Sequence, residues 1–333
     1  MATDAKRDVT VAGGATDGFT HIPVLLPETL GLLDLKEGNR AIDCTTGLGG
    51  HSEDLAEAIG ETGRLLCIDQ DREALEFARR RLSRFGSRIS FRHGNFRELA
   101  SLAKEEGFAP AVNGILVDAG ISSMQIQRAE RGFAFGLEGP IDMRMDRDGE
   151  DPTAGEIVNS WDEASLADIF FRYGEERMSR RIAAAIVRER PLQTTSDLAR
   201  TVEGAVGSAR GRSQIHPATR VFLALRIRVN GELDSLTAVL SPACSLLDPG
   251  TVNRPGGRRA VIAFHSLEDR IVKQYFRRES SDCICPPGLP ECRCGHQATL
   301  KDLTRRPLRP TDAEIARNPR ARSGVLRAVQ RIR

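Results

Sequence analysis

A glycine-rich turn followed by an acidic residue is the first feature of this sequence that suggests chemistry. The stretch DCTTGLGGHS (43–52) follows an apolar run, and Asp69 ends the next apolar run, twenty residues beyond Gly49. Glycines allow the backbone to approach a ligand at the carboxyl edge of a parallel sheet, where such sheets bind ligands. A carboxylate at this spacing accepts hydrogen bonds from the hydroxyls of an adenosine ribose. The pattern predicts a nucleoside-binding strand–helix–strand unit.

The residues around this turn favour one nucleoside cofactor over another. In a dinucleotide fingerprint G-x-G-x-x-G the third glycine would fall on Ser52, so the match is incomplete. Glu53 and Asp54 follow in the first turn of the expected helix, where they would repel a pyrophosphate. S-adenosylmethionine carries a sulfonium cation and no phosphate, so the acidic turn favours it as the cofactor. An NAD-dependent oxidoreductase is the disfavoured alternative.

Asp118 is the candidate catalytic residue. It lies in VDAGISSMQ at the end of another apolar run, which places it beside the expected methyl donor. The lone pair of an exocyclic amine is delocalised into its ring, and an acceptor for the amine N–H groups makes the nitrogen more nucleophilic. The alternative is that Asp118 caps the following turn. The sequence contains no Pro-Cys pair of the kind that methylates ring carbon 5 of cytosine, so transfer to nitrogen or oxygen remains.

The elements that would position these residues alternate along the chain. Five apolar segments are expected to be buried strands: 39–45, 64–69, 89–94, 114–120 and 258–266. Helical patterns separate the first four, and in 73–85 the apolar residues recur at spacings of three and four. This alternation predicts an α/β fold with a Rossmann-like parallel sheet that is covered on both sides.

The long interval between the fourth and fifth segments indicates an inserted domain. Residues 126–214 contain three helical stripes and no convincing strand, and a further helix is predicted at 221–240. We therefore predict an all-helical domain at 126–214 within a discontinuous methyltransferase domain at 19–125 and 215–333. Residues 1–18 mix charge with small residues, lack the apolar stretch of a signal peptide, and are expected to be a disordered lead-in.

Composition and charge favour a cytoplasmic protein that binds a polyanion. The 333 residues are 40% apolar and 28% charged, and no apolar run approaches the roughly 18 residues of a membrane span. Cys44, Cys67 and Cys244 are scattered among apolar neighbours, as expected for reduced buried thiols. Residues 301–333 carry ten basic and three acidic side chains, a net charge of +7, against −5 for the rest. We predict that this basic arm binds nucleic acid; a solvated tail is the alternative.

Several longer motifs resemble those of the bacterial 16S rRNA cytosine-N4 methyltransferases, from His21 to about Arg327. The matching blocks are HIPVLLPE (21–28), TGLGGHS (46–52), IDQD (68–71), HGNF (93–96), DAGISSMQ through ERGFAF to GPIDMRMD (118–146), YGEE (173–176), HPATR (216–220), ALRIRVNGEL (224–233), FHSLEDRIVK (264–273) and NPRARS (318–323). The run that ends in DMRMD, together with FHSLEDRIVK and NPRARS, is highly specific. Gln127, Ala119 and Ala134 depart from the family's usual Asp, Leu and Ser.

The resemblance implies a site for S-adenosylmethionine and a target in ribosomal RNA. The implied cofactor contacts are Gly49, Gly50, His51, Asp69, Phe96, Asp118 and Gln125. The implied substrate is a cytidine in the decoding region of 16S rRNA, within the assembled small ribosomal subunit. The residues expected to bind this RNA are His265, Arg270 and Lys273 in FHSLEDRIVK, and Arg320 and Arg322 in NPRARS. A ribosome-assembly factor without catalytic activity is the alternative, which the presence of both Asp69 and Asp118 disfavours.

Four further cysteines, Cys283, Cys285, Cys292 and Cys294, form two C-x-C pairs. Four thiols within twelve residues allow a zinc site, although structural zinc sites usually space their ligands C-x2–4-C. An ordinary reduced loop is the alternative, and the unusual spacing favours it. We therefore assign no metal ligand from the sequence, and zinc stays open as the second interpretation.

Overall fold

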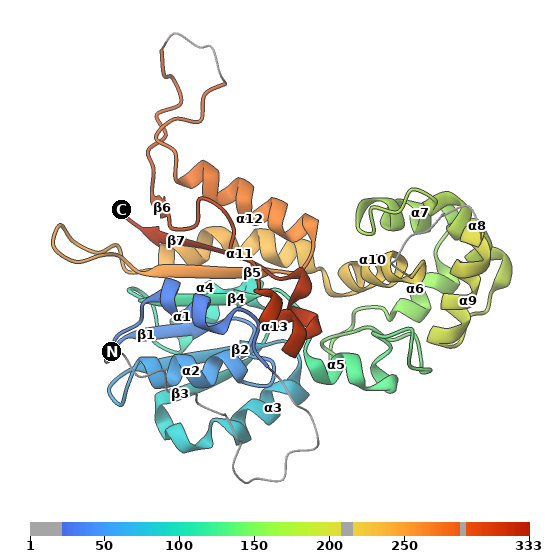
Figure 1. Ribbon diagram of the computed structural model, residues 1–333, viewed down its shortest axis with the longest axis horizontal. Coiled ribbons are helices and arrows are strands. Elements are labelled where there is room, and N and C mark those ends of the chain that lie inside the picture. The colour runs from blue at the N-terminus through green and yellow to red at the C-terminus, as the bar shows by residue number, and fades with distance from the viewer. Residues whose placement is uncertain (1–21, 208–215, 287–290) are drawn as a thin grey trace.

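The computed structural model describes residues 22–207, 216–286 and 291–333. A seven-stranded sheet with the order β3-β2-β1-β4-β5-β7-β6 forms the middle layer of the larger of its two parts (Figure 1). The strands are β1 (Arg40–Asp43), β2 (Arg64–Asp69), β3 (Ile89–His93), β4 (Gly114–Asp118), β5 (Arg258–Ala263), β6 (Leu300–Asp302) and β7 (Val325–Arg331). The first five are parallel to one another, whereas β7 is antiparallel to both β5 and β6. The predicted Rossmann-like α/β class is confirmed.

Helices cover both faces of the sheet because successive side chains of a buried strand point to opposite sides. Ala41 of β1 belongs to the apolar cluster on one face, and Ile42 belongs to the cluster on the other. The first face packs against α1 (Leu26–Leu33), α2 (Gly50–Ala58) and α3 (Arg72–Arg81). The second packs against α4 (Leu99–Glu105), α11 (Glu232–Leu246) and α12 (Ser266–Glu279).

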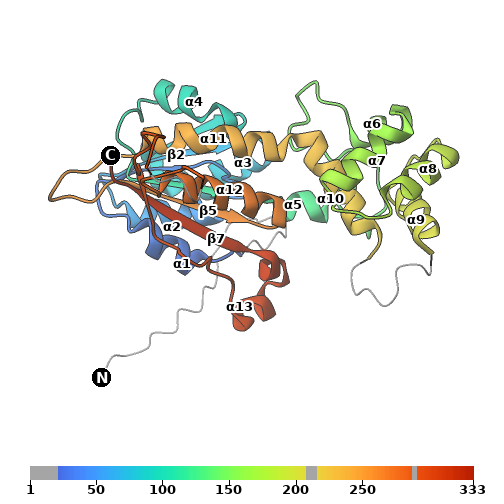
Figure 2. The same ribbon diagram turned by 90° about the horizontal axis from the view of Figure 1, so that it is seen from above.

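A second group of helices has an apolar core of its own and lies at one end of the molecule (Figure 2). It contains α6 (Ala154–Ser160), α7 (Glu163–Arg172), α8 (Ser179–Glu189), α9 (Thr195–Val206) and α10 (Ala218–Asn230). Capping boxes start two of these helices, with Thr153 and Glu156 at α6 and Thr194 and Asp197 at α9. The predicted all-helical insertion is confirmed. Its boundaries at 126 and 214 stay a prediction, and α10 lies beyond the second one.

The prediction of one helix at 221–240 is wrong. The chain forms α10 and α11 instead, and they meet at Gly231, whose φ of 57° lies in the left-handed region that favours glycine. Apolar side chains of α10 pack in the helical group, whereas those of α11 pack on the sheet. The break at Gly231 therefore returns the chain from the inserted helices to the sheet.

The basic C-terminal segment at 301–333 is part of the sheet domain and is not a solvated tail. It forms β6, the short helices α13 (Asp312–Arg317) and η5 (Pro319–Ser323), and β7. Strand β7 is buried between β5 and β6, and its Arg327 donates from Nε to Asp269 Oδ1 over 2.7 Å. Much of the positive charge of this segment is therefore part of the folded domain.

Short helices connect the larger elements; the first of them precedes β3, and the other three follow the carboxyl ends of β3 and β4, where the motifs lie. They are η1 (Ser83–Arg88), η2 (Phe96–Glu98), α5 (Ser123–Gln127) and η3 (Ala129–Arg131). Strand β5 ends at Ala263 and not at residue 266, because the next residues form the capping box of α12. Within the described ranges, no helix has both the length and the apolar character that a membrane span requires.

Candidate active site at the ends of the parallel strands

A pocket of about 570 Å³ opens at the point where the strand order reverses, between β1 and β4. Open α/β sheets bind their ligands at this position, and the volume is in the range of small-molecule sites. The residues that line the pocket include Gly47, His51, Asp69, Phe96, Asp118, Gln125, Ser235, Glu268 and Arg320. They come from segments that are far apart in the sequence and that the sheet brings to one edge.

The glycine-rich turn after β1 contributes its backbone to the pocket. Gly47 lines the pocket at a φ of 52°, and its N–H donates to Asp69 Oδ2 over 2.6 Å. Gly49 is the N-cap of α2 at a φ of 81°, and a Cβ placed there would lie 3.3 Å from the Cβ of Ala78. The lining thus includes Gly47, which was not among the implied contacts. It does not include Gly49 or Gly50, whose assignment as cofactor contacts stays a prediction.

Two carboxyl groups lie at the ends of β1 and β2. Asp69 accepts hydrogen bonds from the amides of Gly47 and Asp71, and burial raises its pKa to about 7. Asp43, which was not predicted as a site residue, is fully buried and accepts a hydrogen bond from Ser52 Oγ over 2.6 Å. Burial raises its pKa to about 6. Carboxyl groups held this way gain from a nearby positive charge, because a cation favours their ionised forms.

Asp118, at the end of β4, lies beside His51 of α2. Burial lowers the pKa of His51 to about 4, so the ring is neutral at pH 7. Its Nε2 lies 3.0 Å from the carbonyl oxygen of Val24, which requires the proton on Nε2 and leaves a lone pair on Nδ1. That Nδ1 lies 3.5 Å from Asp118 Oδ2. His51 Nδ1 is therefore a neutral hydrogen-bond acceptor that faces the carboxyl group of Asp118.

The second carboxyl oxygen of Asp118 is available to a ligand. Oδ1 is buried and has no hydrogen-bond partner among the described residues. Burial raises the pKa of Asp118 to about 8, and the charges of Asp43 and Glu268 act in the same direction. An unpartnered buried acceptor is costly, and a donor from a bound molecule would remove that cost. The site is suited to a ligand that brings an N–H group to Oδ1.

Phe96 and Gln125 both line the pocket, but hydrogen bonds to neighbouring residues fix the side chain of Gln125 alone. Phe96 is partly buried beside the ends of β2 and β3, where its ring is able to face a flat ligand. Gln125 is 4% exposed, and both ends of its amide are used: Oε1 accepts from Ser122 N, and Nε2 donates to Asp71. The arrangement supports Gln125 as a residue that shapes the wall.

Glu268 and Ser235 are further pocket residues that the sequence did not predict. Glu268 of α12 is 1% exposed and accepts from the backbone N–H of Phe264 over 2.8 Å. Ser235 of α11 is also buried, and its Oγ has no hydrogen-bond partner within the described part of the chain. Glu268 lies in FHSLEDRIVK, so the motif itself was a signal. Ser235 carried none, because only the packing of α11 brings it to the pocket.

The five residues predicted to bind RNA do not lie together. Arg320 lines the pocket and donates to Ser123 Oγ. His265 caps α12, and Arg270 pairs with Glu175 over 3.1 Å. Arg322 is exposed on η5.

Lys273 lines a second hollow, of about 310 Å³, between α12, β6 and β7. Arg277, Arg305 and Arg327 line it as well, together with one acidic residue, Asp302. We call this hollow the basic groove. Lys273 therefore lies in the basic groove and not in the pocket at the ends of the strands. An excess of cations in a concave surface attracts phosphate groups.

Comparison with known proteins gives a consistent result over nearly the whole chain. The model of the MraW methylase family matches residues 18–332. A protein of Thermomicrobium roseum named ribosomal RNA small subunit methyltransferase H is 52% identical over 94% of this chain and 94% of its own length. Proteins of the same name from Syntrophotalea carbinolica and Dehalococcoides mccartyi are 50% and 48% identical, each over 94% of this chain and over 98% and 87% of their own lengths.

Proposed function

This chain belongs to the MraW methylase family, and from that membership we propose that it methylates the N4 amino group of a cytidine in 16S rRNA. The resemblance predicted from the sequence is confirmed, and the protein is an S-adenosylmethionine-dependent methyltransferase. The names of its relatives supply the small-subunit rRNA as the class of substrate. The single observation that carries the choice of an amine is the unpartnered Asp118 Oδ1 in the pocket.

The residues around the pocket fit the cofactor. We assign the ribose hydroxyls to Asp69, the adenine to the ring of Phe96, and the close approach of the backbone to the turn from Gly47 to Gly50. S-adenosylmethionine supplies a methyl group on a sulfonium, and its positive charge suits the carboxyl groups at the ends of β1, β2 and β4. The same charge would lower the pKa of Asp118 from about 8 and favour its ionised form.

Asp118 would activate the amine. Ionised Oδ1 accepts one N–H of the cytosine N4 group, which draws electron density towards the nitrogen. Transfer of the methyl group to N4 would break its bond to the sulfonium sulfur, which leaves as a neutral thioether, and the extra proton on the nitrogen would pass to Asp118 Oδ1. The high pKa of the buried carboxyl group favours that transfer. The lone pair of His51 Nδ1 lies 3.5 Å from Oδ2 and disfavours a negative charge there, so it favours protonation of the carboxyl group and His51 acts through Asp118 as a positioning residue.

A second polar group of the pocket, Ser235, would recognise the base. Cytosine presents acceptors at N3 and O2 next to its N4 donor. Ser235 Oγ is a buried hydroxyl without a partner among the described residues, so its proton is available to one of these acceptors. A uracil would place a carbonyl oxygen opposite Asp118 Oδ1 and would be rejected, since two acceptors would then face each other.

The RNA backbone would follow the cationic side chains. Arg320 lies at the pocket, and the basic groove around Lys273 lies farther along α12. Contacts to phosphates position an RNA without reading its sequence. We further propose that the target is in the decoding region, that the assembled small subunit is the substrate, and that the enzyme acts in the cytoplasm, where that subunit is found.

Two measurements test this proposal. Isothermal titration should give binding of S-adenosylmethionine and none of NAD; binding of NAD alone would support the oxidoreductase alternative. Methyl transfer should then be compared on small ribosomal subunits and on a short decoding-region RNA. We expect the subunits to be the better substrate, because an oligonucleotide lacks the folded surface for the basic groove. Binding of S-adenosylmethionine without transfer to any rRNA substrate would favour an assembly factor.

A further inference from the structure

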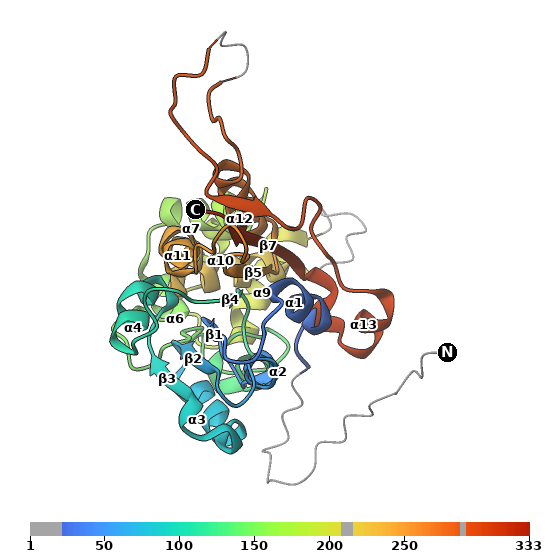
Figure 3. The same cartoon turned by 90° about the vertical axis from the view of Figure 1, so that its left-hand side faces the viewer.

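The two C-x-C pairs lie in the segment between α12 and β6, which projects from the sheet domain (Figures 1 and 3). Cys283, Cys292 and Cys294 are exposed, and Cys285 is partly exposed. Free cysteines are among the most buried residues of proteins, as Cys44 and Cys67 of this chain are. Exposed thiols grouped in this way call for a chemical explanation.

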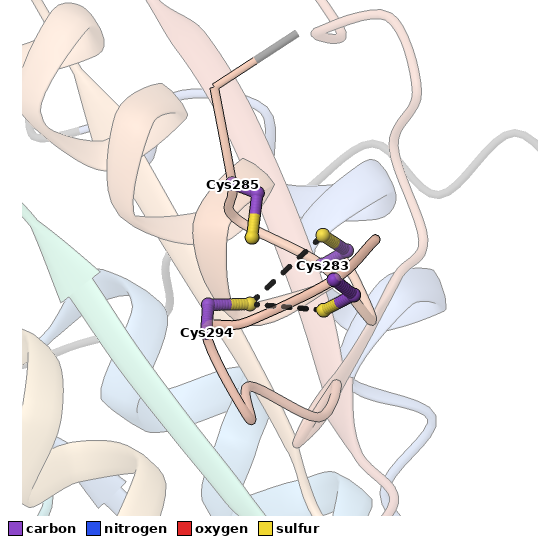
Figure 4. A group of neighbouring side chains, drawn as sticks. Cys283, Cys285 and Cys294 are labelled. Atoms are coloured by element: carbon purple, nitrogen blue, oxygen red, sulfur yellow. Dashed lines mark hydrogen bonds between the residues drawn. The ribbon is translucent and has the colours of Figure 1, made fainter. Parts of the chain in front are cut away.

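The four sulfur atoms converge. They all lie within 4.8 Å of one another, and Cys294 Sγ lies 3.9 Å from Cys283 Sγ and 3.5 Å from Cys292 Sγ (Figure 4). A tetrahedral zinc ion with Zn–S bonds of about 2.3 Å separates its sulfur ligands by about 3.8 Å. A disulfide requires about 2.05 Å, and all four cysteines are free. The spacing is that of a four-coordinate metal site.

The backbone supports the same arrangement in a reciprocal way. Ile284, between the first two cysteines, donates its N–H to Cys294 Sγ over 3.4 Å. Arg293, between the last two, donates its N–H to Cys285 Sγ over 3.4 Å. Hydrogen bonds to the sulfur atoms stabilise thiolates and orient metal ligands. Each C-x-C pair thus supplies two ligands and one amide to the opposite pair.

The segment lacks another source of stability. Apart from Cys285, which is partly exposed, the described residues from Cys283 to Cys294 are mostly exposed, and none of them belongs to an apolar cluster. Two hydrogen bonds anchor its base, from Ala298 N to Asp282 Oδ1 and from His296 Nε2 to the carbonyl of Arg278. A small loop without an apolar core is commonly closed by a metal ion.

We propose that Cys283, Cys285, Cys292 and Cys294 bind one zinc ion, which closes this segment into a metal-stabilised finger. The sequence left a reduced loop as the favoured interpretation because of the C-x-C spacing. The geometry favours zinc over a reduced loop, since the sulfur atoms of the two pairs all lie within 4.8 Å of one another. The site is structural: all four positions are filled by protein ligands, and it lies apart from the pocket residues.

Metal analysis of the purified full-length chain tests the proposal. Protein made in medium with both zinc and iron should contain about one zinc per chain, as expected for a single four-thiolate site. The double variant Cys283→Ser/Cys294→Ser should lose it, whereas the matched control Cys244→Ala should keep it. Binding of S-adenosylmethionine by each variant checks that the sheet domain is folded.

Three outcomes would overturn the proposal. One is zinc in the wild type at no more than the level of the double variant. Another is stoichiometric iron in place of zinc, which would assign a different metal. A third is an intact mass that lacks thiol hydrogens and carries no metal, which would show that the cysteines form disulfides.

Discussion

The pocket and the cysteine finger gather their polar groups in opposite ways. Asp43, Asp69 and Asp118 follow three neighbouring strands and are positioned by a sheet whose two faces are buried. The four cysteines lie within twelve residues, outside every apolar cluster formed by the described residues. The first site is built before its ligand arrives, whereas the second depends on its ligand for shape. Loss of the cofactor should therefore leave the pocket folded, whereas loss of the metal should unfold the cysteine finger.

The largest effect is expected at Asp118. Asp118→Ala removes the acceptor for the amine, and loss of a general base typically slows turnover by about 10²–10⁴-fold. Steady-state methyl transfer to small subunits measures this. The control Gln127→Ala changes an exposed pocket residue with no proposed contact and should stay near wild type. Near-normal turnover by Asp118→Ala would remove this residue as the acceptor.

Asp69→Ala should weaken binding of the cofactor. A hydrogen bond to a charged group contributes about 1.5–3 kcal/mol, so removal of one corresponds to a roughly 10- to 150-fold rise in Kd. Isothermal titration with S-adenosylmethionine measures this, and Asp69→Asn, which keeps one acceptor, should show a smaller rise. Since Asp69 also accepts from Gly47, circular dichroism is needed to check the fold. An unchanged Kd would rule out the ribose assignment.

Removal of the metal should unfold the cysteine finger and leave the pocket intact. A chelator should unfold the finger and speed tryptic cleavage after Arg293, while the Kd for S-adenosylmethionine stays unchanged, because the sheet holds the pocket. Peptide mapping after brief proteolysis reads the first effect, and titration of the same sample reads the second. A parallel loss of cofactor binding would contradict the independence of the two regions.

Stability of the cofactor-free protein should fall as pH rises. Folding holds the pKa of Asp118 at about 8, whereas the usual value of 3.8 applies to the unfolded chain. The folded state therefore binds more protons between these values, and the free energy of unfolding decreases with pH, by up to about 1.4 kcal/mol per pH unit for each such carboxyl group.

Urea unfolding between pH 5 and 8 measures this slope. Asp118→Asn should reduce it, whereas Asp148→Asn, at an exposed carboxyl group paired with Arg72, should not. An equal slope in wild type and Asp118→Asn would mean that Asp118 is already ionised in the free protein.

The smallest effect concerns the basic groove. Lys273→Ala/Arg305→Ala should flatten the dependence of log K on log salt by about 0.7–0.9 for each RNA phosphate that the groove no longer neutralises. Lys36→Ala, at an exposed lysine before β1 that does not line the groove, is the control. A lower melting temperature with an unchanged slope would assign the groove a structural role.

The sequence predicted the parts of the site that are local. Asp69 and Asp118 end apolar runs, and parallel strands bring such ends to one edge, so their proximity followed from the pattern. Ser235 was not predictable, because its place depends on how α11 packs on the sheet after the break at Gly231. Strand β7 was missed because its sequence, VLRAVQR, carries charge that is buried only through partners such as Asp269.

The central claim is that this chain methylates a cytidine amine in 16S rRNA. Mass mapping of methylated nucleotides in 16S rRNA from a deletion strain, carrying either the wild-type chain or Asp118→Ala, tests it most directly. We expect N4-methylcytidine at a decoding-region position with the wild-type chain and unmethylated cytidine at that position with the variant. Equal methylation in both strains, or a methyl group on a ring carbon of the base, would contradict it.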